Sequence, residues 1–267
     1  MITERAPAKV NLLLHVGAPR ADGLHEICSL FATIDLADSV TVEQAAADEV
    51  VCPGVGGPNL AAAAVERFRV EAAPELPPLR VTIEKRIPVA AGLGGGSADA
   101  AAVLRAANAL AGAPLDADGL RSLGMALGAD VPSQVEPRHA LVTGAGEHVE
   151  PVELTPMSLL LLPDEAGLAT AEVYGRADAL GTTRADLDGD AVRALAARPL
   201  YELAANLEND LEGAALALRA DLAGRLDLLR EAGALTARVT GSGPTVFGVF
   251  HAGEAPDLEG AIRAEVA

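Results

Sequence analysis

Tryptophan is absent from the 267-residue chain, and aromatic side chains as a class are scarce, with two tyrosines and four phenylalanines. Half of the residues are nevertheless hydrophobic, so the core must be built from alanine, valine and leucine. A chain of this length can form one large domain or two small ones with well-buried interiors.

Basic residues are also few. The chain has 20 lysines and arginines against 38 aspartates and glutamates, which gives a formal net charge of −18. Nucleic acids and anionic membranes bind to basic surfaces, so this balance argues against both as partners. A phosphate-bearing small molecule is still compatible with it, provided that backbone N–H groups and a few placed cations hold the phosphates.

Cysteines and long apolar runs are equally limited. Cys28 and Cys52 form neither a disulfide framework nor a metal-binding spacing, which favours free thiols in a reducing cytosol. No stretch reaches the roughly 18 apolar residues of a membrane span, and the N-terminus lacks a signal-peptide pattern. We therefore expect a soluble, cytoplasmic protein. The five histidines show no metal-ligand spacing, so we also expect no structural metal site.

Hydrophobic periodicity predicts a mixture of strands and helices without a strict βαβ rhythm, and therefore an α+β fold. The expected strands cover residues 8–16, 25–34, 39–44, 49–52, 79–86, 140–143, 148–152, 158–162, 235–240 and 245–250. The expected helices follow an N-cap at Asn59, cover 98–110, 120–127, 171–180, 190–197 and 201–232, and run from about 254 to the end. The proline-flanked segment 151–156 predicts a boundary between domains 1–153 and 154–267.

The most informative stretch is a loop with four glycines in five residues (Gly92 and Gly94–Gly96), followed by Ser97 and an alanine-rich run. We expect Ser97 to cap the following helix. A glycine loop at a helix start presents unpaired N–H groups and the positive end of the helix dipole to an anion. The alternative is a flexible turn before a buried helix. The loop lacks the lysine of a Walker A motif and the acidic residue of a dinucleotide fingerprint.

Only two of the twenty basic residues are lysines, Lys9 and Lys85. Lys9 and Asn11 share one face of a predicted strand, about 7 Å apart. A lysine in a chain that otherwise uses arginine suggests a task for a compact ammonium group. Lys9 is equally compatible with a surface charge on an edge strand.

Phosphoryl transfer also needs a carboxylate that accepts the hydroxyl proton. Asp130 is the best candidate, because it stands between apolar neighbours before Pro132, which should bias Val131 away from helix and leave Asp130 at a sharp helix exit. A simple capping role is the alternative. The cluster Gly241-Ser242-Gly243-Pro244 is either a second ligand-approach site or a tight hairpin.

Three of these segments together resemble the motifs of the GHMP small-molecule kinases: 6–12 (APAKVNL), 88–98 (PVAAGLGGGSA) and 240–245 (TGSGPT). The segments 20–25 (RADGLH) and 127–132 (LGADVP) resemble the member of that superfamily whose acceptor is a diphosphocytidyl methylerythritol in the non-mevalonate isoprenoid route. The resemblance runs in order over essentially the full length. It implies a two-domain fold with the active site in the cleft between the domains.

The resemblance implies transfer of the γ-phosphate of ATP, with Mg²⁺, to the 2-hydroxyl of that cytidine diphosphate substrate by a monomer or homodimer. Asp130 would be the base and Lys9 would hold Asp130 and the developing alkoxide. The ATP phosphates would contact the loop residues Pro88, Val89, Ala90, Ala91, Gly92, Leu93, Gly94, Gly95, Gly96, Ser97 and Ala98. Substrate would contact Asn11, His25, Thr170, Tyr174, Gly241, Ser242 and Gly243, with His25, Thr170 and Tyr174 on the cytosine side and Asn11 near the reacting end.

One position departs from the pattern, because Leu24 stands where the family usually has a tyrosine that stacks on cytosine. We expect weaker cytidine binding from the loss of roughly 1–3 kcal/mol of stacking energy. Two alternatives remain at this point. One is a homoserine- or mevalonate-type kinase, which has no cytosine to bind and so no use for His25. The other is an inactive nucleotide-binding homologue, which would need neither Lys9 nor Asp130.

Overall fold

The computed structural model describes residues 1–57, 59–164 and 166–266, and the chain divides into two compact units. Unit 1 comprises Met1–Ala8, Leu36–Val89 and Gly94–Arg138. Unit 2 comprises Lys9–Asp35, Ala90–Leu93 and the chain from His139 onward. Two long paired strands, β1 (Ile2–Pro19) and β2 (His25–Gln44), contribute residues to both units. The predicted domains 1–153 and 154–267 are each one continuous segment, whereas each of these units combines several segments. The predicted boundary stays a prediction.

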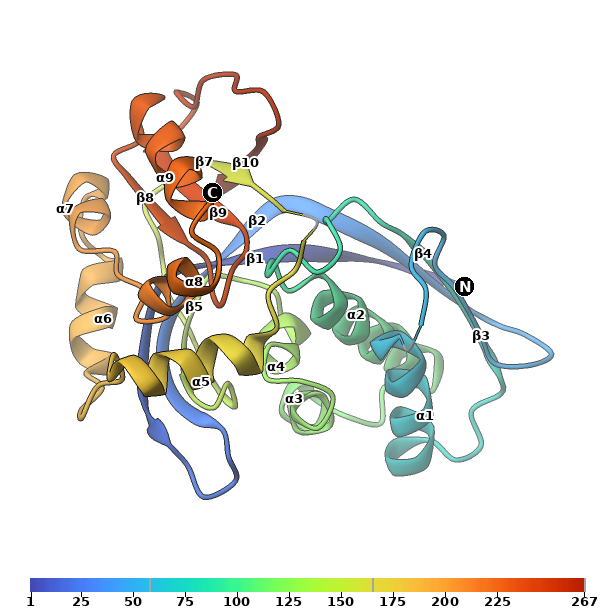
Figure 1. Ribbon diagram of the computed structural model, residues 1–267. Helices are drawn as coiled ribbons and strands as arrows, with labels where there is room; N and C mark the ends of the chain where they lie inside the picture. Colours follow the sequence, from blue (N-terminus) through green and yellow to red (C-terminus); the bar gives the residue numbers. More distant parts are fainter. Residues whose placement is uncertain (58, 165, 267) are drawn as a thin grey trace. The chain divides into compact units, whose positions relative to one another are not determined.

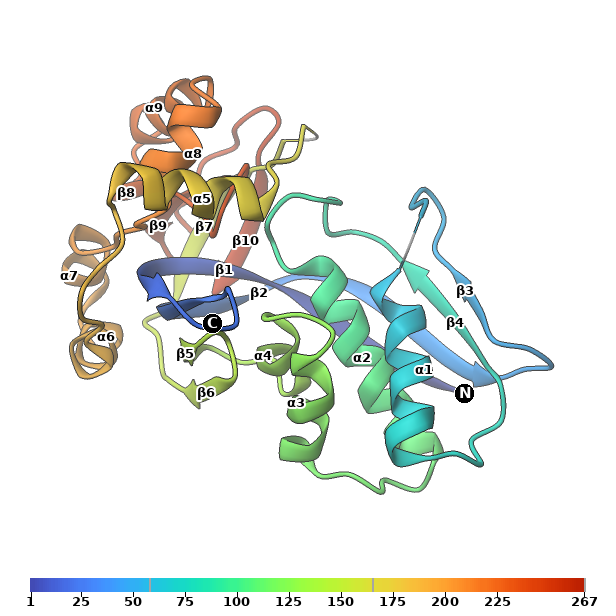
Figure 2. The same cartoon turned by 60° about the horizontal axis from the view of Figure 1, so that its bottom comes forward.

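Unit 1 combines the β3-β4-β2 part of a six-stranded sheet with helices. Strand β4 (Leu79–Glu84) lies between β2, to which it is antiparallel, and the short parallel strand β3 (Glu49–Val51). Helices α1 (Leu60–Ala72) and α2 (Gly95–Leu110) pack side by side (Figures 1 and 2), and α2 also contacts α3 (Ala117–Met125) and α4 (Val131–Val135). The core between them contains Phe68 and a run of buried alanines in α2. Because alanine has no side chain beyond Cβ, α2 can approach its neighbours closely.

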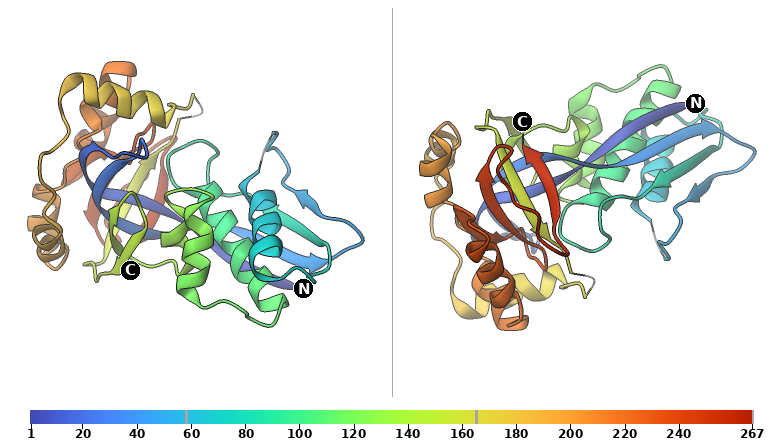
Figure 3. Two further views of the ribbon diagram at one scale, coloured as in Figure 1. Left: turned by 90° about the horizontal axis from the view of Figure 1, so that it is seen from below. Right: turned by 90° about the horizontal axis from the view of Figure 1, so that it is seen from above.

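Unit 2 contains an antiparallel sheet in the order β10-β7-β9-β8. Its strands are β7 (Met157–Leu162), β8 (Thr236–Val239), β9 (Val246–His251) and β10 (Ile262–Val266). Strands β5 (Ala140–Gly144) and β6 (His148–Pro151) extend the β2 pairing. The helices are α5 (Thr170–Leu180), α6 (Gly189–Ala196), α7 (Leu200–Ala205), α8 (Glu212–Leu218) and α9 (Leu222–Glu231). Helix α9 packs on β8 and β9 (Figure 3).

The α+β class and most elements agree with the sequence prediction, and Asn59 does cap α1 by accepting from the Ala61 N–H group. The final segment is different. A helix was expected from about residue 254, whereas the chain forms β10, which pairs antiparallel with β7. Ile262, Ala264 and Val266 alternate as a strand requires. Ala267, the end of the predicted helix, lies outside the described residues.

Three further corrections concern element limits. The two strands expected over 25–34 and 39–44 are one strand, β2, and the helical stretch 201–232 is divided into α7, α8 and α9. Helix α2 begins at Gly95 with Gly94 as its N-cap, so Ser97 lies inside the helix and does not cap it. None of the helices within the described ranges combines the length and the apolar character needed to cross a bilayer.

Candidate active site

The Lys9 side chain lies buried on β1 in unit 2. Its ammonium group donates to Asn11 Oδ1 over 2.6 Å and stands 4.6 Å from the centre of the Phe31 ring. Asn11 in turn donates from Nδ2 to Ser29 Oγ, 2.9 Å away. Lys9 and Asn11 therefore do share a strand face, as predicted, and Lys9 is a buried ammonium group rather than a surface charge. Its surroundings hold the side chain in one direction.

The second glycine cluster, Gly241–Gly243, lies next to Asn11. The backbone N–H of Asn11 donates to Thr240 Oγ1 over 2.8 Å, and a Cβ at Gly241 would lie 3.1 Å from Asn11 Oδ1. Gly241 and Gly243 both have positive φ, 57° and 81°. Glycine is needed at Gly241 because its conformation disfavours other residues and Asn11 approaches it closely. The cluster is thus a tight turn between β8 and β9 and a neighbour of Lys9 as well.

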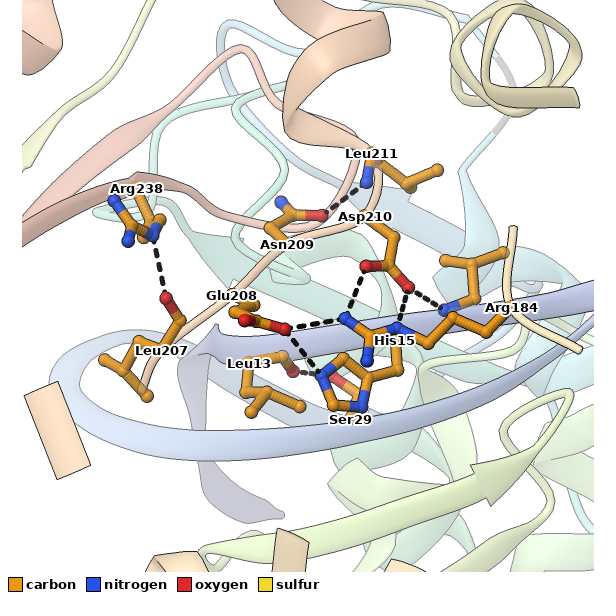
Figure 4. A network of polar contacts seen from close by, with 11 residues as sticks. Leu13, His15, Ser29, Arg184, Leu207, Glu208, Asn209, Asp210, Leu211 and Arg238 are labelled. Atoms are coloured by element: carbon orange, nitrogen blue, oxygen red, sulfur yellow. Dashed lines mark hydrogen bonds and ion pairs between the residues drawn. The ribbon is translucent and has the colours of Figure 1, made fainter. Parts of the chain in front are cut away.

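The segment that holds this turn belongs to a network of polar contacts in unit 2, which Figure 4 shows around Arg184, Glu208 and Asp210. Asn209 Nδ2 donates to the carbonyl oxygens of Val239 and Gly241, at 2.7 and 2.9 Å. The segment around Asn209 lies beside β1, because the Leu14 N–H group donates to the Glu208 carbonyl oxygen and the Asp210 N–H group donates to the Leu14 carbonyl oxygen. Arg184 donates to both Asp210 and Glu208. Asp210 also accepts from the Val16 N–H group. Sequence reasoning missed Asn209, which stands in no recognisable motif.

Part of the first glycine loop, Ala90–Leu93, belongs to unit 2. Its Leu93 carbonyl accepts from the backbone N–H of Lys9 over 3.0 Å. A Cβ at Gly92 would lie only 2.7 Å from the Gly243 carbonyl oxygen, so the two glycine motifs pack backbone against backbone. Three of the sequence-predicted segments, around Lys9, Gly92 and Gly241, are therefore neighbours within one unit.

The rest of the loop leads into α2 in unit 1. Ala90, Gly92 and Gly94 alternate along the loop with positive φ values of 58°, 76° and 71°. Successive backbone N–H groups in such alternating conformations form concavities that bind anions. No side chain caps the N-terminus of α2 after Gly94, and the first turn of the helix (Gly95, Gly96 and Ser97) carries no negative charge. The first N–H groups of α2 are thus suited to an anionic ligand.

Asp130 lies in the same unit as the start of α2. It is the N-cap residue of the short helix α4, and its side chain makes no capping hydrogen bond to that helix. Pro132 is accommodated in the first turn of α4, so the expected helix exit at Asp130 is wrong and the residue marks a helix start. A Cβ at Gly128 would lie 3.9 Å from Ser97 Oγ, which places the Gly128–Asp130 turn beside the first turn of α2.

The predicted base-binding residues come together in unit 2. Residues 20–24 form a turn in which Gly23 N–H donates to the Arg20 carbonyl oxygen. His25 follows it, with its ring centre 4.9 Å from that of Tyr174 on α5. At the start of α5, Thr170 Oγ1 lies 3.2 Å from Ser242 Oγ. Helix α5 thus extends from the second glycine cluster to His25.

Three carboxylates that bind His25 or Lys85 were not predicted. Asp178 lies one helical turn after Tyr174, and its Oδ1 is 2.9 Å from His25 Nε2. Asp99 lies on α2 and binds Lys85 together with Asp38. The sequence could have indicated Asp178, because residues four apart on a helix share a face and Tyr174 was already a candidate. No pattern links Asp38 with Asp99.

Comparisons with known proteins agree with these motifs. Residues 59–136 match the model of the GHMP kinases N terminal domain, and residues 191–267 match that of the GHMP kinases C terminal domain. The chain is 40% identical over 260 residues to 4-diphosphocytidyl-2-C-methyl-D-erythritol kinase of Kineococcus radiotolerans, covering 92% of this chain and 80% of that protein. It is 43% identical over 256 residues to the enzyme of the same name from an Anaeromyxobacter species, covering 92% and 81%.

Solved structures give the same result. A crystal structure of 4-(cytidine 5'-diphospho)-2C-methyl-D-erythritol kinase superposes with a TM-score of 0.81 at 35% identity, covering 99% of this chain and 98% of that one. A homoserine kinase from Cytophaga hutchinsonii has a TM-score of 0.70 at 18% identity, covering 95% and 86%, which shows the shared fold alone. Family models, relatives and fold agree: this chain is an α+β protein of the GHMP kinases and belongs, within them, to the 4-diphosphocytidyl-2-C-methyl-D-erythritol kinases.

Proposed function

We propose that this chain transfers the γ-phosphate of ATP to the 2-hydroxyl group of 4-diphosphocytidyl-2-C-methyl-D-erythritol, in the cytoplasm, as a step towards isoprenoid precursors. The observation that carries the proposal is that the Gly128–Asp130 turn lies beside the first turn of α2. The first turn of α2 offers N–H groups to a phosphate, and the Asp130 carboxylate of the neighbouring turn can take a proton from an incoming hydroxyl group.

The chemistry needs little covalent work from the protein. Asp130 accepts the proton of the 2-hydroxyl group, whose oxygen then forms a bond to the γ-phosphorus while the bond from that phosphorus to the β,γ-bridging oxygen breaks. The products are the 2-phosphate and ADP. The Lys9 ammonium offsets the negative charge that develops, and Asn11 keeps it pointing in one direction. The proposal therefore assigns the proton transfer to Asp130 and the compensation of charge to Lys9.

Residues 88–98 hold the ATP phosphates in this proposal, mainly through backbone N–H groups. Mg²⁺ would accompany the nucleotide, since this ion is commonly bound by phosphate oxygens with only one or two protein ligands. The Ser97 hydroxyl group, beside Gly128, is an oxygen donor of the kind that suits it. Bound Mg²⁺ would neutralise charge on the transferring group.

The substrate's cytidine end is assigned to His25, with Tyr174 beside it. Thr170, expected on the cytosine side, is assigned with Ser242 towards the reacting end instead, because the two hydroxyl oxygens lie 3.2 Å apart. From Thr170 to Tyr174 the axis of α5 rises about 6 Å, which suits an extended diphosphate substrate. Asp178 accepts a hydrogen bond from His25 Nε2 in this arrangement. The imidazole is then fixed, and its Nδ1 is left to bind the base.

The experiment that tests the proposal replaces Asp130 by asparagine, which keeps the shape and removes the base. We expect kcat with the cytidyl substrate to fall by about 10²–10⁴, while the Kd of ADP from calorimetry stays within about twofold, since asparagine leaves the phosphate-binding N–H groups in place. Asp118→Asn, a replacement of an exposed carboxylate on α3 in the same unit, is the matched control and should leave both values unchanged.

Parallel assays with homoserine, mevalonate and the uridyl analogue of the substrate define the acceptor. ADP should form rapidly with the cytidyl compound, and much more slowly with each of the other three acceptors. Undiminished turnover in Asp130→Asn would remove this residue from the mechanism, and preferential turnover of another alcohol would replace the acceptor.

A further inference from the structure

A buried cluster of three charges in unit 1 has no part in the reaction described above. Lys85 Nζ donates to Asp38 Oδ2 over 2.5 Å and to Asp99 Oδ2 over 2.8 Å. The side chains of Asp38 and Asp99 are 0% and 5% exposed, and that of Lys85 is 14% exposed. Removing charges from water is costly, and well-packed apolar residues often stabilise a fold as well as a buried ion pair does. The cluster therefore calls for a reason other than stability.

The three residues lie at the two ends of the glycine loop. Lys85 follows β4 directly and stands just before the loop, whereas Asp99 is on α2 just after it. Asp38 fixes the entry, because its Oδ1 accepts from the backbone N–H groups of Arg86 and Ile87, at 2.6 and 2.9 Å. Lys85 then connects this entry, through its second hydrogen bond, to the helix at the exit.

Gly95 brings the two ends into direct contact. A Cβ at this first residue of α2 would lie 3.0 Å from Ile87 Cγ2 and 3.3 Å from Lys85 Nζ. The first turn of α2 therefore rests on the cluster itself. Since no side chain caps this turn, its direction depends on such contacts.

Asp99 has an incomplete set of hydrogen bonds. Its Oδ1 is buried and has no hydrogen-bond partner among the described residues. A buried acceptor without a partner is unfavourable, so the residue serves through its contact with Lys85. That contact is the one that spans the loop.

We propose that Asp38, Lys85 and Asp99 form a clamp that joins the two ends of the glycine loop and positions its N–H groups for the ATP phosphates. The inference rests on the proposed function. The three are positioning residues, because their hydrogen bonds go to one another and to the loop's backbone. The clamp also explains Lys85, whose compact ammonium group reaches two carboxylates at one point.

The test compares Asp99→Ala, which breaks the clamp, with Asp99→Asn, which keeps an oxygen acceptor for Lys85. We expect Asp99→Ala to raise the KM for ATP and the Kd for ADP by about tenfold, which is 1.4 kcal/mol. The KM for the cytidyl acceptor should stay within about twofold, and Asp99→Asn should recover most of the loss. Amide hydrogen exchange in residues 88–97 should accelerate in Asp99→Ala.

The matched control is Asp48→Ala, which removes a bidentate ion pair with Arg69 and a bond to the Leu79 N–H group elsewhere in unit 1. It should lower stability without changing the KM for ATP. If Asp99→Ala does not fold, the triple variant Asp38→Asn/Lys85→Met/Asp99→Leu replaces it, because it removes the clamp and leaves no unpaired charge.

Equal ATP and ADP constants in wild type and in the clamp variant, or equal exchange in the loop, would overturn the proposal. A wild-type protein that binds ADP but does not phosphorylate the cytidyl compound would instead contradict the proposed function. In that case the calorimetric Kd of ADP still tests the clamp on its own.

Discussion

The two lysines of the chain have different surroundings and, in our proposals, different tasks. Lys9 is held by Asn11 and faces the Phe31 ring, whereas Lys85 is bound by two buried carboxylates. The sequence singled out both residues by their rarity. It assigned only Lys9 to the site, because Asp38 is 47 residues from Lys85, Asp99 lies beyond the glycine loop, and no motif pairs either carboxylate with Lys85. Partners of this kind are determined by tertiary packing.

Leu24 offers a direct test of base recognition. Its side chain is 44% exposed in the turn before His25, so a larger ring can be placed there without disturbing a core. Leu24→Tyr should lower the KM for the cytidyl substrate by about tenfold, because an aromatic ring stacks on a base with roughly 1–3 kcal/mol. Steady-state kinetics at saturating ATP measures this. Val70→Tyr, at an exposed apolar site in unit 1, is the control, and an unchanged KM in Leu24→Tyr would exclude the stacking explanation.

Asp99 should also give stability a distinct dependence on pH. Burial raises the pKa of its carboxyl group from 3.8 to about 6, against the opposing effect of Lys85. The folded state therefore keeps the proton between about pH 4 and 6 while the unfolded chain has lost it, so this group's contribution to stability falls as pH rises through that window. The unfolding free energy of wild type relative to Asp99→Asn should decrease from pH 4 to pH 6.5 in urea titrations. A constant difference would mean that Asp99 titrates normally.

At the scale of elements, the glycine loop shows where sequence reasoning was sufficient and where it failed. The loop, the helix after it and the second glycine turn were all predicted. The cap was not, because several glycines and Ser97 are all acceptable N-cap residues, and only the left-handed conformation of Gly94 decides among them. The strand β10 was taken for a helix because alanine and glutamate near the C-terminus favour helices, and its pairing with β7 overrode that preference.

Gly92 allows the backbone contact between the two glycine motifs to be tested. In Gly92→Ala the new Cβ would lie 2.7 Å from the Gly243 carbonyl oxygen at a residue with a φ of 76°. We expect the free energy of unfolding to fall by more than the roughly 1–2 kcal/mol of left-handed strain, and kcat/KM for ATP to fall with it. Gly112→Ala, with a φ of 85° and open space around it, shows the strain alone. Equal losses in the two variants would mean that the loop yields without consequence.

At the scale of the whole molecule, the excess of acidic residues dominates. A net charge of −18 over 267 residues implies mutual repulsion that favours expansion. Raising NaCl from 10 to 150 mM should increase the Tm by about 2–4 °C, equivalent to about 1 kcal/mol, because salt screens this repulsion. Salt also weakens exposed ion pairs such as Arg193 with Glu150, but these pairs contribute little to the free energy of unfolding. KCl should act equally in differential scanning calorimetry, and a falling Tm would show that attractive pairs prevail.

The interleaving of the two units along the chain has a consequence for how such a protein can be divided. Unit 1 needs the first eight residues as well as two later segments, and residues 9–35 and 90–93 of unit 2 stand between them. No single break in the gene can therefore deliver the two units as separate polypeptides. Fragment complementation, domain exchange with a related enzyme and fusion at an internal junction would all have to respect four crossings of the chain up to residue 94 and a fifth at residue 139.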